Sequence, residues 1–155
     1  MKYRRFLTMT AAAVVVASAA SAQTIEMIVP FSAGGGTDTV ARAFAPAYGE
    51  VLDQTVIIKN LDGASGTIGA NEVARARPDG ATLGYLPIGI AIQPLLRKTA
   101  YALDEFTYIC QTTSTPMFLM TQTDSPMNTV ADVIKAGTDG RIMYGSSGPG
   151  TLPHL

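Results

Sequence analysis

Two short stretches rich in glycine and small hydroxyl residues constrain this chain more than any other feature. The first reads VPFSAGGGTD from Val29 to Asp38, and the second reads MYGSSGPGT from Met143 to Thr151. Each follows an apolar segment; the first precedes a segment with a helix signal, and the second would open a helix just where the sequence ends. Glycine has no Cβ, so an anion can approach the backbone closely. The start of a helix also leaves about four N–H groups without partners, so both stretches are typical of anion sites built from backbone donors.

Apolar, β-branched segments alternate with segments of helical spacing in the first hundred residues. The spacing predicts a helix from Thr37 or Asp38 to about Leu52, which Pro46 would kink or split, and helices over 68–76 and 90–97. Strands are predicted at Ile25–Val29, Val56–Lys59, Thr82–Leu86 and Thr107–Gln111. This alternation predicts an α/β fold with a mostly parallel sheet and helices on both faces. Ligands of such sheets bind beyond the carboxyl ends of the strands, where the first glycine loop would lie.

The composition changes at Thr112–Pro116, which is polar and rich in turn formers. We interpret this stretch as a crossover into a second lobe. Beyond it the pattern predicts strands at 117–121 and 142–144 and a capped helix over 129–136. The predicted organisation is a signal peptide at 1–22, a first lobe at 23–112, and the incomplete start of a second lobe at 113–155. We expect a longer product, truncated here in its second lobe.

The N-terminus has the order of a secretory signal peptide. Lys2, Arg4 and Arg5 precede the apolar run Phe6–Ala17, and Ala20-Ser21-Ala22 follows as a small-residue cleavage site. The apolar run is shorter than the roughly 20 residues of a membrane span. A buried N-terminal helix is the alternative, disfavoured because the run is apolar on all faces. We therefore expect cleavage after Ala22 and an exported protein that is not membrane-embedded; the sequence leaves the Sec and twin-arginine export routes open.

The charge balance and the scarce ligand residues exclude several classes. Cleavage after Ala22 would remove three of the 11 basic residues and none of the 12 acidic ones, leaving a net charge of −4. That balance argues against nucleic acid as a partner, because nucleic-acid-binding domains are usually basic. Cys110 is the only cysteine and His154 the only histidine, so no internal disulfide, metal site or cofactor is predicted.

Nucleotide and hydrolase motifs are each incomplete. A P-loop requires a lysine, but no lysine or arginine lies between Pro30 and Ala41. A dinucleotide fingerprint needs glycine at position 39, which is threonine here. The second stretch misses the G-x-S-x-G elbow by one residue, because Ser147 is followed by Gly148 and Pro149. We predict a protein that is not an enzyme. An exported serine hydrolase fragment using Ser146 or Ser147 is kept as an alternative.

The candidate ligand residues are those that offer backbone N–H or hydroxyl donors in the two stretches. They are Phe31, Ser32, Ala33, Gly34, Gly35, Gly36, Thr37 and Asp38 in the first, and Ser146, Ser147, Gly148 and Thr151 in the second. Asp38 is interpreted first as a helix cap and second as a group that orders a ligand or a water. Because no cation lies in either stretch, Gly35→Val is expected to abolish binding and Arg42→Ala to change it little.

The chain resembles the substrate-binding receptors of tripartite tricarboxylate transporters, the Bug family. The resemblance rests on the signal peptide and on five motifs in order: Ile28–Asp38, Val40-Ala41-Arg42, Gly69-Ala70 with Val73-Ala74, Pro78-Asp79-Gly80, and Tyr144–Gly148. It departs at Leu61-Asp62-Gly63, where an Arg-Pro-Gly type sequence is usual. The resemblance implies a two-lobed, type II-like periplasmic binding protein without a cofactor. It also implies small carboxylate ligands, held by backbone groups and waters of both loops, and delivery to membrane transporter subunits. A truncated receptor relic that no longer binds is the further alternative.

Overall fold

A three-stranded parallel sheet forms the centre of the structure, a computed structural model that describes residues 24–140 and 142–154. The strands are β1 (Ile25–Val29), β2 (Val56–Asn60) and β3 (Thr82–Gly84), in the order β2-β1-β3. Met27 of β1 lies opposite Ile58 of β2 and Leu83 of β3. The predicted signal peptide lies outside the described residues.

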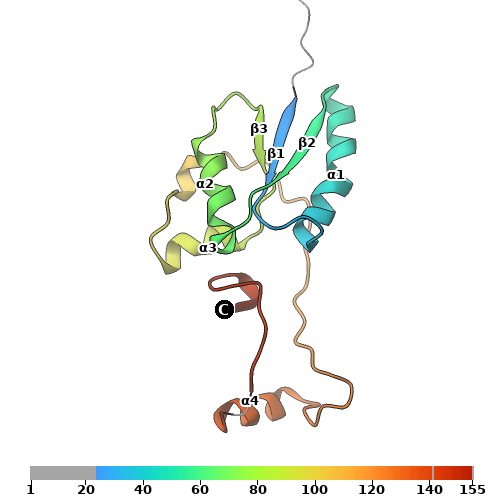
Figure 1. Cartoon of the computed structure of the whole chain (residues 1–155), viewed down its shortest axis with the longest axis vertical. Helices are drawn as coiled ribbons and strands as arrows, with labels where there is room; N and C mark the ends of the chain where they lie inside the picture. The colour runs from blue at the N-terminus through green and yellow to red at the C-terminus, as the bar shows by residue number, and fades with distance from the viewer. Residues whose placement is uncertain (1–23, 141, 155) are drawn as a thin grey trace, which may run out of the picture.

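Helices connect the strands and continue the chain beyond them (Figure 1). The α-helices are α1 (Gly36–Leu52), α2 (Thr67–Arg75), α3 (Gly89–Leu96) and α4 (Val130–Thr138), and the short 3₁₀ helices are η1 (Ala64–Gly66), η2 (Leu103–Glu105) and η3 (Leu152–His154). Pro46 and Pro94 lie inside α1 and α3 without splitting them. Pro46 is exposed, so water can solvate the carbonyl that loses its helical partner.

The two crossovers place helices on opposite faces of the sheet. The first connection runs from β1 through α1 to β2, and the second returns across β1 through α2 to β3. Since crossovers between parallel strands are right-handed, connections that move in opposite directions must use opposite faces, as Figure 1 shows for α1 and α2. Met27 and Val29 pack with Ala41 of α1, whereas Ala70 of α2 packs in a second cluster with Ile90 and Tyr101.

Three of the predicted strands are wrong. Segments 107–111, 117–121 and 142–144 have no strand pairing in the structure. Their apolar side chains are exposed, with Ile109 at 71%, Phe118 at 74% and Met143 at 98%. Apolar, β-branched residues favour a strand, but a strand exists only when its backbone groups pair with a neighbour. No described segment lies beside these three as a partner. The third strand is confirmed but ends at Gly84 rather than Leu86.

The region beyond Thr112 lies apart from the sheet and then returns to it. An extended connection leads to α4, and the chain comes back so that η3 lies near α3 (Figure 1). The predicted cap of α4 is confirmed, because Asp132 N–H donates to Thr129 Oγ1 and the Asp132 carboxylate accepts from Thr129 N–H. No helix of the described residues is long and apolar enough to cross a membrane. The lobe boundary between 112 and 113 stays a prediction.

Candidate ligand-binding site

The first glycine loop lies beyond the carboxyl end of β1, where the sheet reverses its strand order. Chain connections leave β1 and β3 toward opposite faces, and such a switch point is where open α/β sheets bind ligands. The backbone amide of Leu61 donates to Val29 O at 2.9 Å, which continues the pairing of β1 and β2 up to the loop. The loop residues Ser32 to Gly36 are exposed. The sequence-based placement of this loop is therefore confirmed by the sheet order.

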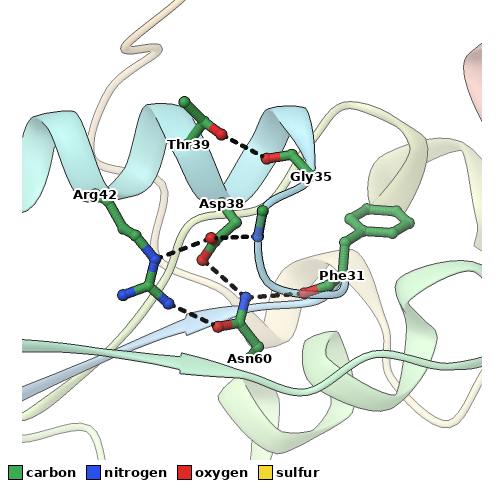
Figure 2. A network of polar contacts seen from close by, with 7 residues as sticks. Phe31, Gly35, Asp38, Thr39, Arg42 and Asn60 are labelled. Atoms are coloured by element: carbon green, nitrogen blue, oxygen red, sulfur yellow. Dashed lines mark hydrogen bonds and ion pairs between the residues drawn. The ribbon is translucent and has the colours of Figure 1, made fainter.

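A buried carboxylate holds the loop in shape (Figure 2). The Asp38 side chain is 2% exposed. Its Oδ2 accepts from Gly34 N–H at 2.8 Å and from Arg42 Nε at 2.9 Å, and its Oδ1 accepts from Asn60 Nδ2 at 2.9 Å. Asn60 Nδ2 also donates to Phe31 O at 2.9 Å, and Arg42 Nη2 donates to Asn60 Oδ1 at 3.0 Å. These bonds tie the loop to both α1 and β2.

The same contacts set the charge state of Asp38. The Arg42 hydrogen bond, followed by the bonds from Gly34 and Asn60, lowers the pKa of Asp38 from 3.8 to about 2. These donors stabilise the carboxylate more than the neutral acid. Asp38 is therefore ionised at any physiological pH, and its charge is matched by the guanidinium of Arg42.

The predicted cap role of Asp38 takes a different form in the structure. Asp38 is the third residue of α1, and the residue at the cap position is Gly35, which makes no side-chain cap bond. The Asp38 carboxylate instead reaches back to the amide of Gly34, as an acidic residue in a capping box reaches back past the first turn. Since both its oxygens accept hydrogen bonds from protein groups, Asp38 orders the loop rather than offering a free oxygen to a ligand.

The backbone conformation that favours glycine occurs at Gly34 and not at Gly35. Gly34 has a φ of +81°, which side chains rarely adopt. Gly35 has a φ of −72°, and a Cβ there would lie 3.2 Å from Ser32 O. Gly35 therefore does not supply a positive φ, and the expected effect of Gly35→Val would come from its close approach to Ser32 O. A Cβ on Gly36 would meet no atom within 4 Å, which leaves open space in front of the first turn of α1.

The open donors of this loop are main-chain amides. Across residues 24–140 and 142–154, no group accepts a hydrogen bond from the amides of Gly36 and Thr37, as is usual in the first turn of a helix. The Ser32 hydroxyl is already used, because it donates to Asp62 Oδ2. Asp62 belongs to the segment Leu61-Asp62-Gly63, where the sequence departs from the family that it resembles. It places a carboxylate beside a loop expected to hold an anion.

The second glycine loop is closed on itself. Thr151 Oγ1 donates to Gly148 O at 2.6 Å, and Thr151 is only 5% exposed. Gly148 N–H donates to Ser146 Oγ at 3.4 Å. Ser147 is exposed and its hydroxyl makes no bond to any other described residue. Of the three predicted hydroxyl donors in this loop, Ser147 is therefore the one that remains open to a ligand.

The structure brings the two loops to the same end of the sheet, on either side of η1. Gly66 of η1 lies against the first loop, since a Cβ there would be 3.3 Å from Phe31 Cζ. Ser65 of η1 lies against the second loop, since a Cβ on Gly148 would be 2.9 Å from Ser65 Oγ. The loops share this neighbour but exchange no hydrogen bond within the described residues. The candidate site is thus the pair of loops together with η1.

The hydrolase alternative has one supporting contact and lacks the rest of a catalytic triad. Ser146 Oγ lies 3.3 Å from His154 Nδ1. A triad also requires an acidic group that orients the histidine, and no described carboxylate bonds to His154. Ser146 Oγ also accepts from Gly148 N–H, which does not activate a nucleophile.

Sequence reasoning missed three residues that shape the site: Arg42, Asn60 and Gln93. The first could have been found, because Arg42 lies four residues after Asp38, and such pairs meet on a helix surface. Asn60 ends β2 at the same edge as the loop, which is a weaker signal. Gln93 is a polar residue on an apolar helix and carries no motif.

A parallel α/β sheet with free main-chain amides at its switch point is the arrangement with which open α/β folds bind small anions. The sequence model of the tripartite tricarboxylate transporter family receptor matches residues 40–155. The chain belongs to this family of receptors, which confirms the resemblance and the prediction of a binding protein rather than an enzyme.

Individual relatives agree with that membership. The chain is 36% identical over 156 residues to a UPF0065 protein of Bordetella pertussis, covering 94% of this chain and 48% of that protein. It is 29% identical over 152 residues to Protein BugT of the same organism, covering 93% and 46%. The chain thus spans less than half the length of these curated relatives.

A solved structure supports the fold. Rpa4515 of R. palustris, determined with adipate, matches with a TM-score of 0.55 and 29% identity, covering 75% of this chain and 40% of that one. This similarity and the family confirm the predicted α/β class of periplasmic binding proteins.

Proposed function

We propose that this protein is a periplasmic receptor that captures a small carboxylate and delivers it to membrane transporter subunits of the tripartite tricarboxylate type. Membership of the receptor family supports the transport role. The adipate in the related R. palustris structure supports a carboxylate as the ligand class. The exported location rests on the signal-like order of residues 1–22.

The observation that carries this proposal is the first loop, with open amides and a rigid support. The amides of Gly36 and Thr37 point their donors out of the start of α1, where the helix dipole favours an anion. The buried Asp38 network keeps the loop in this shape before a ligand arrives. A carboxylate would take its donors from these amides, from the Thr37 and Ser147 hydroxyls, and from water. No basic side chain is needed for this mode of binding.

The strength of such a site can be estimated. A hydrogen bond to a charged group contributes about 1.5–3 kcal/mol net. Four of them at the upper end of this range, less the smallest cost of immobilising the ligand, about 4 kcal/mol, give about −8 kcal/mol, which corresponds to micromolar affinity. That range suits a receptor that must release its ligand to a transporter.

Calorimetry on the mature protein, with a panel of mono- and dicarboxylates that includes adipate, tests the ligand class. We expect at least one carboxylate to bind with micromolar affinity. We expect no binding of the matching amides, because they carry no charge. If no member of the panel binds to a folded protein, the receptor proposal fails and the relic alternative gains support.

Export and delivery need separate tests. Mass spectrometry of the periplasmic fraction should find a chain that begins at Gln23, and a chain that retains Met1 would contradict cleavage. Uptake of the bound carboxylate should fall when the gene is deleted. Unchanged uptake would contradict delivery while leaving binding intact.

A further inference from the structure

Gln93 of α3 joins the body of the fold to the second glycine loop. Its side chain is 0% exposed, and its Nε2 donates to Pro149 O at 3.2 Å, 56 residues further along the chain. Gly89 and Ile90 are the other buried residues of α3. Gly89 lies under the same loop, because a Cβ there would be 3.7 Å from Thr151 Cα. One face of α3 therefore supports the second loop.

The glycines of the second loop allow this close approach. Gly150 has a φ of +75°, and a Cβ there would lie 3.0 Å from both Nε2 and Oε1 of Gln93. Gly148 has a φ of +121°, and its Cβ would lie 2.9 Å from Ser65 Oγ. Each position is closed to a side chain by its conformation and by its neighbour. These two glycines therefore permit packing against Ser65 of η1 and Gln93 of α3.

The Gln93 amide is only half satisfied. Its Oε1 is buried and accepts no hydrogen bond from the described residues. Gln93, Arg97, Gly150 and His154 line a cavity of about 220 Å³ between α3 and the loop. A buried amide destabilises a fold unless its hydrogen bonds are made. The bond to Pro149 offsets part of this cost, and the free Oε1 is left to accept from an N–H or O–H group that enters the cavity.

We propose that Gln93 is a positioning residue of the ligand site, which docks the second glycine loop onto α3 before the ligand arrives. This inference rests on the proposed function and identifies the contact that sets how the second loop meets the ligand. A docked loop holds Ser147 at the same end of the sheet as the open amides of Gly36 and Thr37. The entropy cost of ordering the loop is then met during folding and is not subtracted from binding.

Gln93→Leu and Gln93→Glu test the docking contact, because neither a leucine nor a carboxylate can donate to Pro149 O. Hydrogen exchange of the peptide covering 145–153, measured without ligand, should be about tenfold faster in both variants. The peptide covering 31–38 should exchange as in the unmodified protein. Adipate, or the best carboxylate of the panel, should bind about threefold to tenfold more weakly, which corresponds to one lost buried hydrogen bond.

Asn71→Leu is the matched control. Asn71 is on α2, and its Oδ1 is also buried without a partner in the described residues. Removing this amide should leave exchange of 145–153 unchanged. If Asn71→Leu accelerates that peptide as much as Gln93→Leu, a general loss of stability explains both and the docking role is overturned.

Hydrogen exchange of Gln93→Glu at low pH adds a measurement that distinguishes loss of the hydrogen bond from loss of packing. A protonated glutamic acid can donate to Pro149 O, so slow exchange of 145–153 should return in Gln93→Glu at low pH and not in Gln93→Leu. Each variant is compared with the unmodified protein at the same pH, because Arg97 and His154 line the same cavity. Identical behaviour of the two variants at every pH would overturn the hydrogen-bond mechanism. Exchange needs no ligand, so a failure to bind carboxylates would count against the proposed function alone.

Discussion

The two glycine loops have similar sequences and different surroundings. The first is exposed from Ser32 to Gly36 and is held from below by the buried Asp38 carboxylate. The second is closed by Thr151, which is 5% exposed, and lies against Ser65 and Gln93. The first loop is held by a side chain beneath it, whereas Gly148 and Gly150 of the second loop pack against Ser65 and Gln93 and leave Ser147 exposed. A run of glycines therefore does not by itself distinguish an anion cradle from a close packing contact.

The comparison also shows where rigidity comes from. Side chains hold the first loop, through a network that reaches α1 and β2. The second is held by hydrogen bonds within the loop, where the Thr151 hydroxyl and amide both donate to Gly148 O, and by the Gln93 side chain, which links the loop to α3. We therefore expect the first loop to be sensitive to changes of charge and the second to changes of volume.

The largest effect is expected from Asp38→Ala. The change leaves the donors on Gly34, Arg42 and Asn60 without their common acceptor, so the first loop should lose its shape. Carboxylate affinity, measured by calorimetry, should fall on the order of a hundredfold, because the loop loses the acceptor that joins it to α1 and β2. Asp132→Ala is the control, since Asp132 caps α4 and its pKa is also lowered, first by the Thr129 side chain. Equal losses in the two variants would remove the distinction between the loops.

A smaller loss is expected from Gly34→Ala. Gly34 has a φ of +81° with open space around it, so alanine adds conformational strain of about 1 kcal/mol and no clash. Gly80→Ala is a close control, because Gly80 also has a φ of +81° and open space. Both variants should lower the melting temperature alike, but only Gly34→Ala should weaken ligand binding. Equal affinity in both would show that the first loop does not contact the ligand.

Arg42→Ala should have a modest effect, in contrast to the near absence of effect expected from sequence. Arg42 bonds to Asp38 at 2.9 Å, but its side chain is 51% exposed, so solvent screens the pair. We expect about a threefold loss of affinity. Arg75→Ala on α2, an exposed arginine outside the loops, should show none. A complete loss of binding in Arg42→Ala would mean that the arginine contacts the ligand directly.

The smallest effect is expected from a change of pH near neutrality, because Asp38 stays ionised there. Its pKa in the folded protein is about 2, below the ordinary 3.8. Its stabilising contribution is therefore complete above about pH 4 and is lost as the pH falls toward 2. The amide resonance of Gly34, followed by NMR, should be constant from neutral pH to about 4 and then shift. A midpoint near the ordinary value would contradict the network.

Several features could be predicted from local pattern because their causes are local. The three paired strands, α1 and the capping box at Thr129 depend on nearby residues: apolar spacing, β-branching and a threonine three positions before an aspartate. The place of the first loop follows from the rule that parallel sheets bind ligands at their carboxyl ends. These predictions are confirmed.

Other features depend on distant partners. Segments 107–111 and 117–121 carry strand-forming residues, but pairing requires a neighbouring strand, which the described structure does not provide. The role of Asp38 depends on Asn60, 22 residues away, and the place of the second loop depends on Gln93. No spacing rule connects such residues.

The sequence by itself determined the fold class, the family and the end of the sheet where the first glycine loop lies. These follow from periodicity, from turn chemistry and from motifs whose order can be read along the chain. Only the tertiary structure decided that the Asp38 carboxylate holds the first loop and that Gly148 and Gly150 of the second loop pack against Ser65 and Gln93. Whether a loop amide stays free is decided by the groups that folding brings against it, and those groups come from other strands and helices.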